Sequence, residues 1–158
     1  MKKYVLFFCL MVGLQGVVHA QQNRIAMLPI DKAYIDGTDR SGYYKEVCGA
    51  IVFYQGDDGA LYMSNMMILK DTQSFGPVTE RKKRFIRDFA IGRIDLLDFR
   101  WSYENDYDDK SGGATCRLHF APLNTKTVFA LEIRTDSGSV LQYEGVFVGS
   151  INELLEQW

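Results

Sequence analysis

The chain has 158 residues, with 18 Lys and Arg against 20 Asp and Glu and a formal net charge of −2. Proteins that bind nucleic acid usually carry a basic excess that neutralises phosphates, so this charge argues against nucleic-acid binding. A chain of this length typically folds as one domain around a core of its own.

The first twenty residues have the pattern of a secretory signal peptide. Residues 2–3 are both lysine, residues 4–12 are apolar, and Val18-His19-Ala20 has the composition of a signal-peptidase site. The apolar segment is shorter than the roughly twenty residues that a membrane-spanning helix needs. We therefore expect cleavage after Ala20 and a secreted or periplasmic bacterial protein. Its mature part, residues 21–158, forms a single β-domain with no transmembrane segment.

The mature chain begins with strand patterns separated by turn residues. Ile25–Ile30 predicts a strand, which Pro29 restricts to a sheet edge or a strand end. The polar segment Asp31–Tyr44 is expected to be a loop that crosses one end of the sheet. Cys48–Tyr54 and Leu61–Leu69 are rich in β-branched and apolar residues. They flank a turn of Gly and Asp, which predicts a hairpin.

Two further hairpins follow an ambiguous segment. Phe85–Ile91 fits a strand face and a helix face equally well, and we expect a strand with a loop before it. Residues 97–104 and 115–120 alternate between apolar and polar side chains, as do residues 128–134 and 140–148. A period of two with one apolar face is what a half-buried antiparallel sheet requires.

The C-terminal segment Ser150–Trp158 predicts a short helix that Ser150 caps. Its apolar side chains form one stripe that can dock on the sheet: Ile151, Leu154, Leu155 and Trp158. The fold class is therefore all-β: a single antiparallel sandwich or barrel of about seven or eight strands with a short C-terminal helix.

A strand meander followed by a helix is similar in outline to small ligand-binding barrels such as lipocalins. Gly42-Tyr43-Tyr44 matches their early Gly-x-Trp signature only in part, because the Trp is missing. The resemblance concerns the fold, and a fold does not by itself determine function.

Two cysteines remain after the signal peptide, Cys48 and Cys116. An even pair in an oxidising compartment predicts a disulfide. A bridge that closed this long loop would stabilise the chain by roughly 4 kcal/mol in the chain-entropy account. The alternative is two separate buried thiols, because free cysteine packs as a small apolar residue.

Catalytic and metal-binding patterns are weak. His119 is the only histidine after Ala20, and alternation places it on the outward face of its strand. We therefore expect His119 to be a surface residue and not the base of a nucleophilic triad. The acidic turn Asp106–Gly113 does not have the spacing of a calcium loop. We expect no catalytic residue, no metal and no cofactor.

One concentrated basic run stands out. It consists of Arg81, Lys82, Lys83 and Arg84. Such a patch can attract an anion or an acidic partner. A charged strand edge that blocks aggregation explains the same residues.

These observations favour an exported, non-enzymatic binding protein with an unknown small ligand or protein partner. In one version the barrel interior holds a small apolar ligand. The residues that would line this interior are Leu61, Met63, Met67, Phe99, Trp101 and Phe120. In the other version the core is filled and loops bind a protein. The alternative class is a hydrolase acting on glycans through a pair of carboxylates. Its candidate acids are Asp95, Asp98, Glu104, Glu132 and Glu144.

Overall fold

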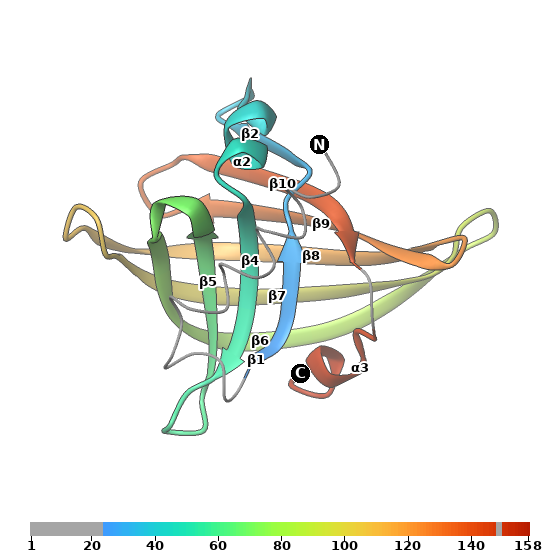
Figure 1. The fold of residues 1–158 in the computed structure, drawn as a ribbon. Coiled ribbons are helices and arrows are strands. Elements are labelled where there is room, and N and C mark those ends of the chain that lie inside the picture. Colours follow the sequence, from blue (N-terminus) through green and yellow to red (C-terminus); the bar gives the residue numbers. More distant parts are fainter. Residues whose placement is uncertain (1–23, 148–149) are drawn as a thin grey trace.

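The computed structural model describes residues 24–147 and 150–158, so the predicted signal peptide lies outside the described residues. These residues form an all-β fold, a single antiparallel sheet of ten strands that curls into a half-barrel (Figure 1). The strand order is β1-β4-β5-β6-β7-β8-β9-β10-β2-β3. The all-β class is confirmed, but the sheet is a half-barrel rather than a sandwich or closed barrel, and it has more strands than the seven or eight expected. No helix in the described part is long and apolar enough to cross a membrane.

The elements follow the predicted hairpins closely. Strands β4 and β5, β7 and β8, and β9 and β10 pair as expected, and β1 is an edge strand that ends at Pro29. The strands are β1 (Arg24–Pro29), β2 (Lys32–Ile35), β3 (Thr38–Asp39), β4 (Gly49–Gln55), β5 (Leu61–Met67), β6 (Thr72–Asp88), β7 (Gly92–Asn105), β8 (Ser111–Leu123), β9 (Lys126–Thr135) and β10 (Val140–Phe147). The helical segments are α2 (Ser41–Glu46), η1 (Ile68–Lys70) and α3 (Asn152–Leu155).

The two additional strands come from the segment Asp31–Tyr44, where a loop was predicted. Strand β2 pairs with β10, so that Ala33 faces Tyr143, and β3 forms a short hairpin with β2. The helix α2 follows and buries Tyr44. The prediction was wrong because β2 has only four residues, too few to show an alternating pattern among polar neighbours.

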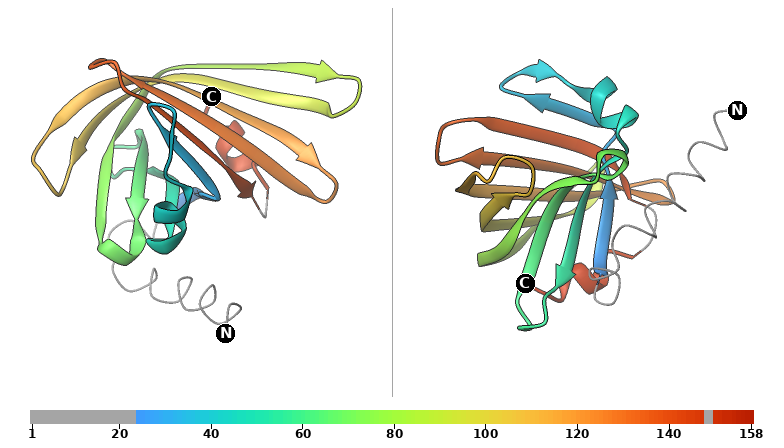
Figure 2. Two further views of the ribbon diagram at one scale, coloured as in Figure 1. Left: turned by 90° about the horizontal axis from the view of Figure 1, so that it is seen from above. Right: turned by 60° about the vertical axis from the view of Figure 1, so that its left-hand side comes forward.

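Strand β6 also differs from the prediction. It is a continuous strand of 17 residues, so no loop precedes Phe85. Pairing with β5 ends at Pro77, and from there β6 pairs with β7 alone until Asp88 faces Gly92. Proline is tolerated here because the edge beyond it has no strand partner that needs an N–H donor. The exposed residues 79–93 form the projecting hairpin, visible in green and yellow in Figure 2.

The inward faces of the strands form one core. Strands β6 to β9 cross β1, β4 and β5 steeply, so side chains from both groups meet inside the curl (Figure 1). The alternation assigned these faces correctly, because successive side chains of a strand point to opposite sides. Inward side chains with 2% exposure or less include Phe53, Met63, Leu97, Leu118, Phe120, Leu131, Ile133 and Tyr143.

The C-terminal helix covers this core. Leu154 is fully buried, and the ring of Trp158 makes edge contacts with Phe53 and Phe99 at centroid distances of 6.0 and 5.6 Å. The hydroxyl of Ser150 accepts a hydrogen bond from the Asn152 N–H at 3.2 Å. The predicted docking stripe is confirmed. The helix is shorter than the segment expected, and Ile151 rather than Ser150 is its N-cap residue, with no side-chain cap.

The chain between β1 and β2 joins the two ends of the sheet. Only Ile30 and Asp31 separate these strands, yet β1 pairs with β4 and β2 pairs with β10. The Ile30 N–H donates to the Gly49 carbonyl and the Asp31 N–H to the Glu144 carbonyl, both at 2.9 Å. The Asp31 carboxylate accepts from the Val146 N–H at 3.2 Å. We call this junction the seam.

The predicted disulfide between Cys48 and Cys116 is not formed. Cys116 is a free thiol with 0% exposure, pointing into the core from β8. Cys48 precedes β4, and three strands stand between β4 and β8 in the sheet. The bridge was predicted from an even cysteine count and an expected oxidising compartment, whereas alternation along β8 places Cys116 in the core. Burial raises the pKa of the Cys116 thiol far above its usual value.

We predict that Gly145→Ala destabilises the fold at the seam. A Cβ at this position would overlap the carbonyl oxygen of Pro29, a backbone atom that cannot move without opening the seam. Overpacking of this kind costs about 1–3 kcal/mol in the free energy of unfolding. Gly42→Ala in α2 is the matched control, because nothing lies within 4 Å of its added Cβ. Denaturant unfolding of both variants checks the prediction, and equal stability would contradict it.

We also predict that the Cys116 thiol reacts only after unfolding. The thiolate is the nucleophile, and a buried thiol of raised pKa supplies almost none of it. Residues 21–158 are alkylated without reductant, first native and then in denaturant, and the peptides are mapped by mass spectrometry. Cys116 should be modified in the second step only. A peptide pair linked through Cys48 and Cys116 would refute this.

Candidate functional site

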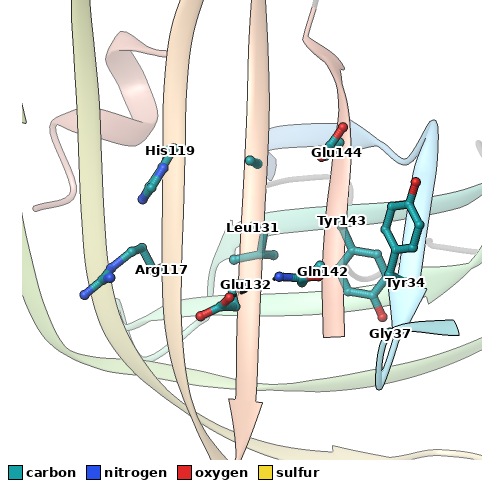
Figure 3. A pocket seen from close by; sticks show the side chains of 10 residues that line it. Tyr34, Gly37, Arg117, His119, Leu131, Glu132, Gln142, Tyr143 and Glu144 are labelled. Carbon is teal, nitrogen blue, oxygen red and sulfur yellow. Dashed lines mark hydrogen bonds between the residues drawn. The ribbon is translucent and has the colours of Figure 1, made fainter. Parts of the chain in front are cut away.

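Two adjoining hollows lie on the outer face of the sheet. The first has a volume of about 480 Å³ and the second about 460 Å³. Both are lined by His119, Ala130 and Glu144, so together they form one feature, which we call the outer groove. Figure 3 shows the first hollow. The other side chains of the groove come from β2, β7, β8, β9 and β10 and from Asp31, which precedes β2.

Strand register explains why the hollow lies there. Ala130 on β9 faces His119 on β8 and Glu144 on β10, and Glu144 in turn faces Lys32 on β2. These four residues form the middle rung of the groove. Because alanine has a short side chain, the rung is low at Ala130 and higher on both sides, which leaves a depression.

The rungs on either side differ in polarity. Ala121, Val128 and Val146 form an apolar rung, in which Ala121 faces Val128 and Val128 faces Val146. On the other side a polar rung crosses the sheet. Its members are Asp98, Arg117, Glu132, Gln142 and Tyr34, each facing the next. The outer groove is therefore amphipathic along the strand direction.

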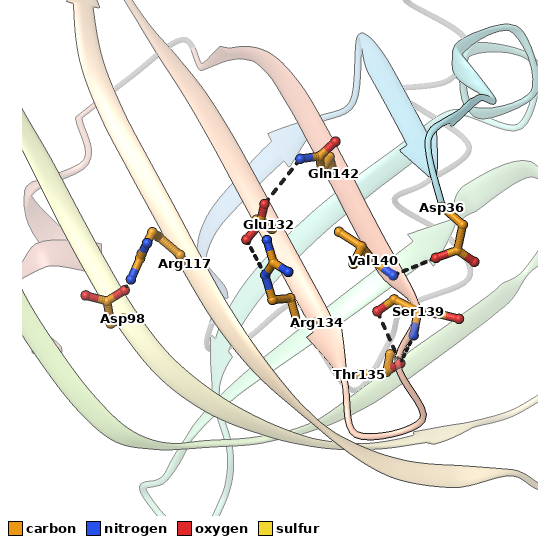
Figure 4. Close-up of polar contacts among 9 residues, drawn as sticks. All are labelled: Asp36, Asp98, Arg117, Glu132, Arg134, Thr135, Ser139, Val140 and Gln142. Atoms are coloured by element: carbon orange, nitrogen blue, oxygen red, sulfur yellow. Dashed lines mark hydrogen bonds and ion pairs between the residues drawn. The ribbon is translucent and has the colours of Figure 1, made fainter.

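Ion pairs hold the polar rung in place (Figure 4). The Arg117 guanidinium lies 2.7 Å from Asp98. Glu132 accepts hydrogen bonds from Arg134 at 2.7 Å and from Gln142 at 3.2 Å. The hydrogen bond from Arg134 lowers the pKa of Glu132, although partial burial opposes it. Burial alone would raise the pKa of Asp98, but Arg117 and Arg84 lower it overall.

His119 is the unusual member of the middle rung. Its side chain is half-buried, and Nε2 has no hydrogen-bond partner among the described residues. Burial lowers its pKa, and the positive charge of Arg117 lowers it further. The imidazole is therefore neutral near pH 7, and its unpaired Nε2 is buried against the sheet. On the other side of Ala130, Glu144 pairs with Lys32 at 3.0 Å.

The lowered pKa of Glu132 does not favour a general-acid role in the groove. A general acid needs a carboxyl that stays protonated near neutral pH, and the lowered pKa of Glu132 works against that role. In the part of the chain that the structure describes, no three His, Cys, Asp or Glu side chains are grouped so that they could hold a metal ion. Ion pairs fix the polar groups of the outer groove, and the apolar rung of the groove is open to a ligand.

The residues predicted to bind an apolar ligand lie mainly in the packed core. Met67 is half-buried near the end of β5, and the other four are at most 3% exposed: Met63, Phe99, Trp101 and Phe120. The Trp101 indole donates to the Met63 carbonyl at 3.1 Å. Side chains with so little exposure do not line an open cleft. Binding by these residues stays a prediction, and it would require the core to open.

The predicted basic patch is divided between two faces of β6. Arg81 and Lys83 donate to the Gln157 and Leu155 carbonyls near the chain end, each at 2.6 Å. Arg84 lies on the opposite face and pairs with Asp98 at 3.3 Å. Cations are favourable beside the free carbonyls at a helix C-terminus, so part of the run holds α3. A role in binding partners stays a prediction for these residues and Lys82.

The sequence had placed His119, Glu132 and Glu144 on outward faces without bringing them together. Their meeting depends on the position of β2 beside β10, which local pattern does not reveal. One signal was present. The two-residue connection between Leu123 and Lys126, paired as a tight hairpin, sets His119 opposite Ala130.

Comparison of the chain with protein-family models, with curated proteins and with solved structures found no significant match.

We predict that the pKa of His119 lies below 6.5 in the folded protein. At a pH between the lowered pKa of the folded state and the pKa of the unfolded state, about 6.5, the unfolded state binds more protons than the folded state. This group's contribution to stability is therefore full above about pH 6.5 and decreases as the pH falls. In residues 21–158 His119 is the only histidine, so its NMR titration is unambiguous. His119→Gln should reduce the loss of stability between pH 7.5 and 5. A pKa at or above 6.5 would contradict the desolvated geometry.

Proposed function

We propose that this protein is an exported, non-enzymatic binding protein that holds a small amphipathic molecule in the outer groove. The observation that carries the proposal is the groove itself, a hollow graded from apolar to polar, on a domain whose interior is filled. Export rests on the signal-peptide pattern of the first twenty residues.

The size and lining of the groove support a small ligand. Small-molecule sites typically measure about 300–1,000 Å³, and each hollow falls within that range. The polar rung is already held by its ion pairs, so little side-chain ordering is needed on binding. The hollows are open to solvent, which favours a modest affinity.

His119 indicates what the polar part of the ligand does. An unpaired buried polar atom costs about 1–3 kcal/mol, and a ligand group that pairs with Nε2 once the ring turns toward the groove would recover part of it. His119 and Ala121 lie two residues apart on β8, a separation of about 7 Å along a strand. The ligand class is therefore a molecule with a hydrogen-bonding group about 7 Å from an apolar group such as a phenyl ring or short alkyl chain.

A decisive test uses two probes of this class, 3-phenylpropanoate and 3-phenylpropanamide, titrated into residues 21–158 and followed by amide NMR. We expect shifts confined to the groove, with Ala130 at their centre. Ala130→Trp fills the depression and should weaken binding at least tenfold. Thr115→Trp is the matched control, because Thr115 is exposed on β8 outside both hollows.

Two outcomes would overturn the proposal. One is unchanged binding by Ala130→Trp, and the other is a set of shifts centred on core residues such as Phe99. Comparing the charged with the neutral probe tells whether the carboxylate or the hydrogen bond to His119 matters more.

A further inference from the structure

The projecting hairpin carries an exposed apolar apex. Phe85, Ile86, Phe89 and Ile91 lie within seven residues, and each is about half exposed or more, with Phe89 fully exposed. The remaining large exposed apolar side chains of the described residues are scattered over other parts of the surface. Large apolar side chains gathered at one projecting tip mark an interaction site.

The apex is ordered rather than a loose loop. Strands β6 and β7 stay paired up to Asp88 and Gly92. The Asp88 carboxylate accepts hydrogen bonds from the N–H groups of Ala90 and Ile91 at 2.8 and 2.9 Å. The turn is therefore fixed with Phe89 at its tip, and little conformational entropy is lost when this tip meets a partner.

Positive charge lies directly behind the apex. Residues 80–93 contain six basic and two acidic side chains, in a chain whose formal net charge is −2. Arg87 and Arg93 face each other across the hairpin. Arg93 lies 4.5 Å from the centre of the Phe85 ring and pairs with Asp95, while Arg87 has no ion pair among the described residues. The rest of the molecule is more acidic, so an anionic surface would orient this hairpin toward itself.

The shape favours a lipid surface over a protein partner. A stable protein interface buries roughly 800 Å² on each partner, which the narrow end of a two-stranded ribbon does not provide. A bilayer needs no such area, because one or two apolar side chains can enter the boundary between headgroups and acyl chains. Arginines behind the apex then meet the headgroup phosphates.

We propose that the projecting hairpin docks the protein on an anionic lipid bilayer, with Phe89 and Ile91 inserted and Arg87 and Arg93 at the phosphates. The site is separate from the outer groove, and the proposal does not depend on ligand binding there.

The test is flotation of residues 21–158 with vesicles of equal parts phosphatidylglycerol and phosphatidylcholine, against phosphatidylcholine alone. We expect binding to the anionic vesicles only. Phe89→Ser should reduce the partition coefficient at least tenfold and Arg87→Glu by a similar factor. Leu69→Ser is the matched control, since Leu69 is about as exposed as Ile91 but lies on η1. Because all three positions are exposed, we expect the variants to keep the thermal midpoint of the unsubstituted protein. Measuring these midpoints verifies that the variants fold.

A second measurement reports insertion directly. Phe89→Trp places an indole at the apex, and its emission should shift to shorter wavelength with anionic vesicles. No binding of the unsubstituted protein to anionic vesicles would overturn the proposal. Binding that Arg87→Glu abolishes but Phe89→Ser leaves intact would also overturn it, because contact would then be electrostatic without insertion.

Discussion

The seam is the constraint on which the rest of this structure depends. Two residues connect β1, which pairs with β4, to β2, which pairs with β10, so the sheet must curl until its ends meet. That curl turns the apolar faces of β6 to β9 toward those of β4 and β5, and α3 packs against the core they form. The close approach of Pro29 to β10 also explains why residue 145 is a glycine.

The seam shapes the outer surface as well. It brings β2 beside β10, so Lys32 extends the middle rung, which contains His119, and Tyr34 extends the polar rung, which contains Arg117. The inside is occupied by large side chains, with Trp158 against Phe53 and Phe99. The two sites that we propose for recognition, the amphipathic groove and the projecting hairpin, therefore both lie on the outside. Basic residues of β6 serve both stability and surface charge, since Arg81 and Lys83 hold the chain end while Arg87 stays at the hairpin.

Local pattern predicted most of the fold, and geometry between distant strands accounts for what it missed. Alternation assigned Phe99, Leu118 and Leu131 to the inward face because a period of two is a local property. The sequence pattern did not predict the short strand β2, which lies among polar residues. It also did not predict the full length of β6, because a proline such as Pro77 typically ends a strand. The groove needs both the alternation and the order of strands, so its residues were predicted outward but not together. Cysteine count likewise could not tell that Cys116 belongs to the core.

The central claim is that the interior is filled and binding occurs on the outer face. Xenon binds in empty apolar cavities and does not bind in a core that has no such cavity. Crystals of residues 21–158 pressurised with xenon test the claim most directly. The account predicts no xenon site among the inward side chains of β5, β7 and β8. An ordered xenon atom between Met63, Phe99 and Phe120 would contradict it and would return the ligand site to the interior of the half-barrel.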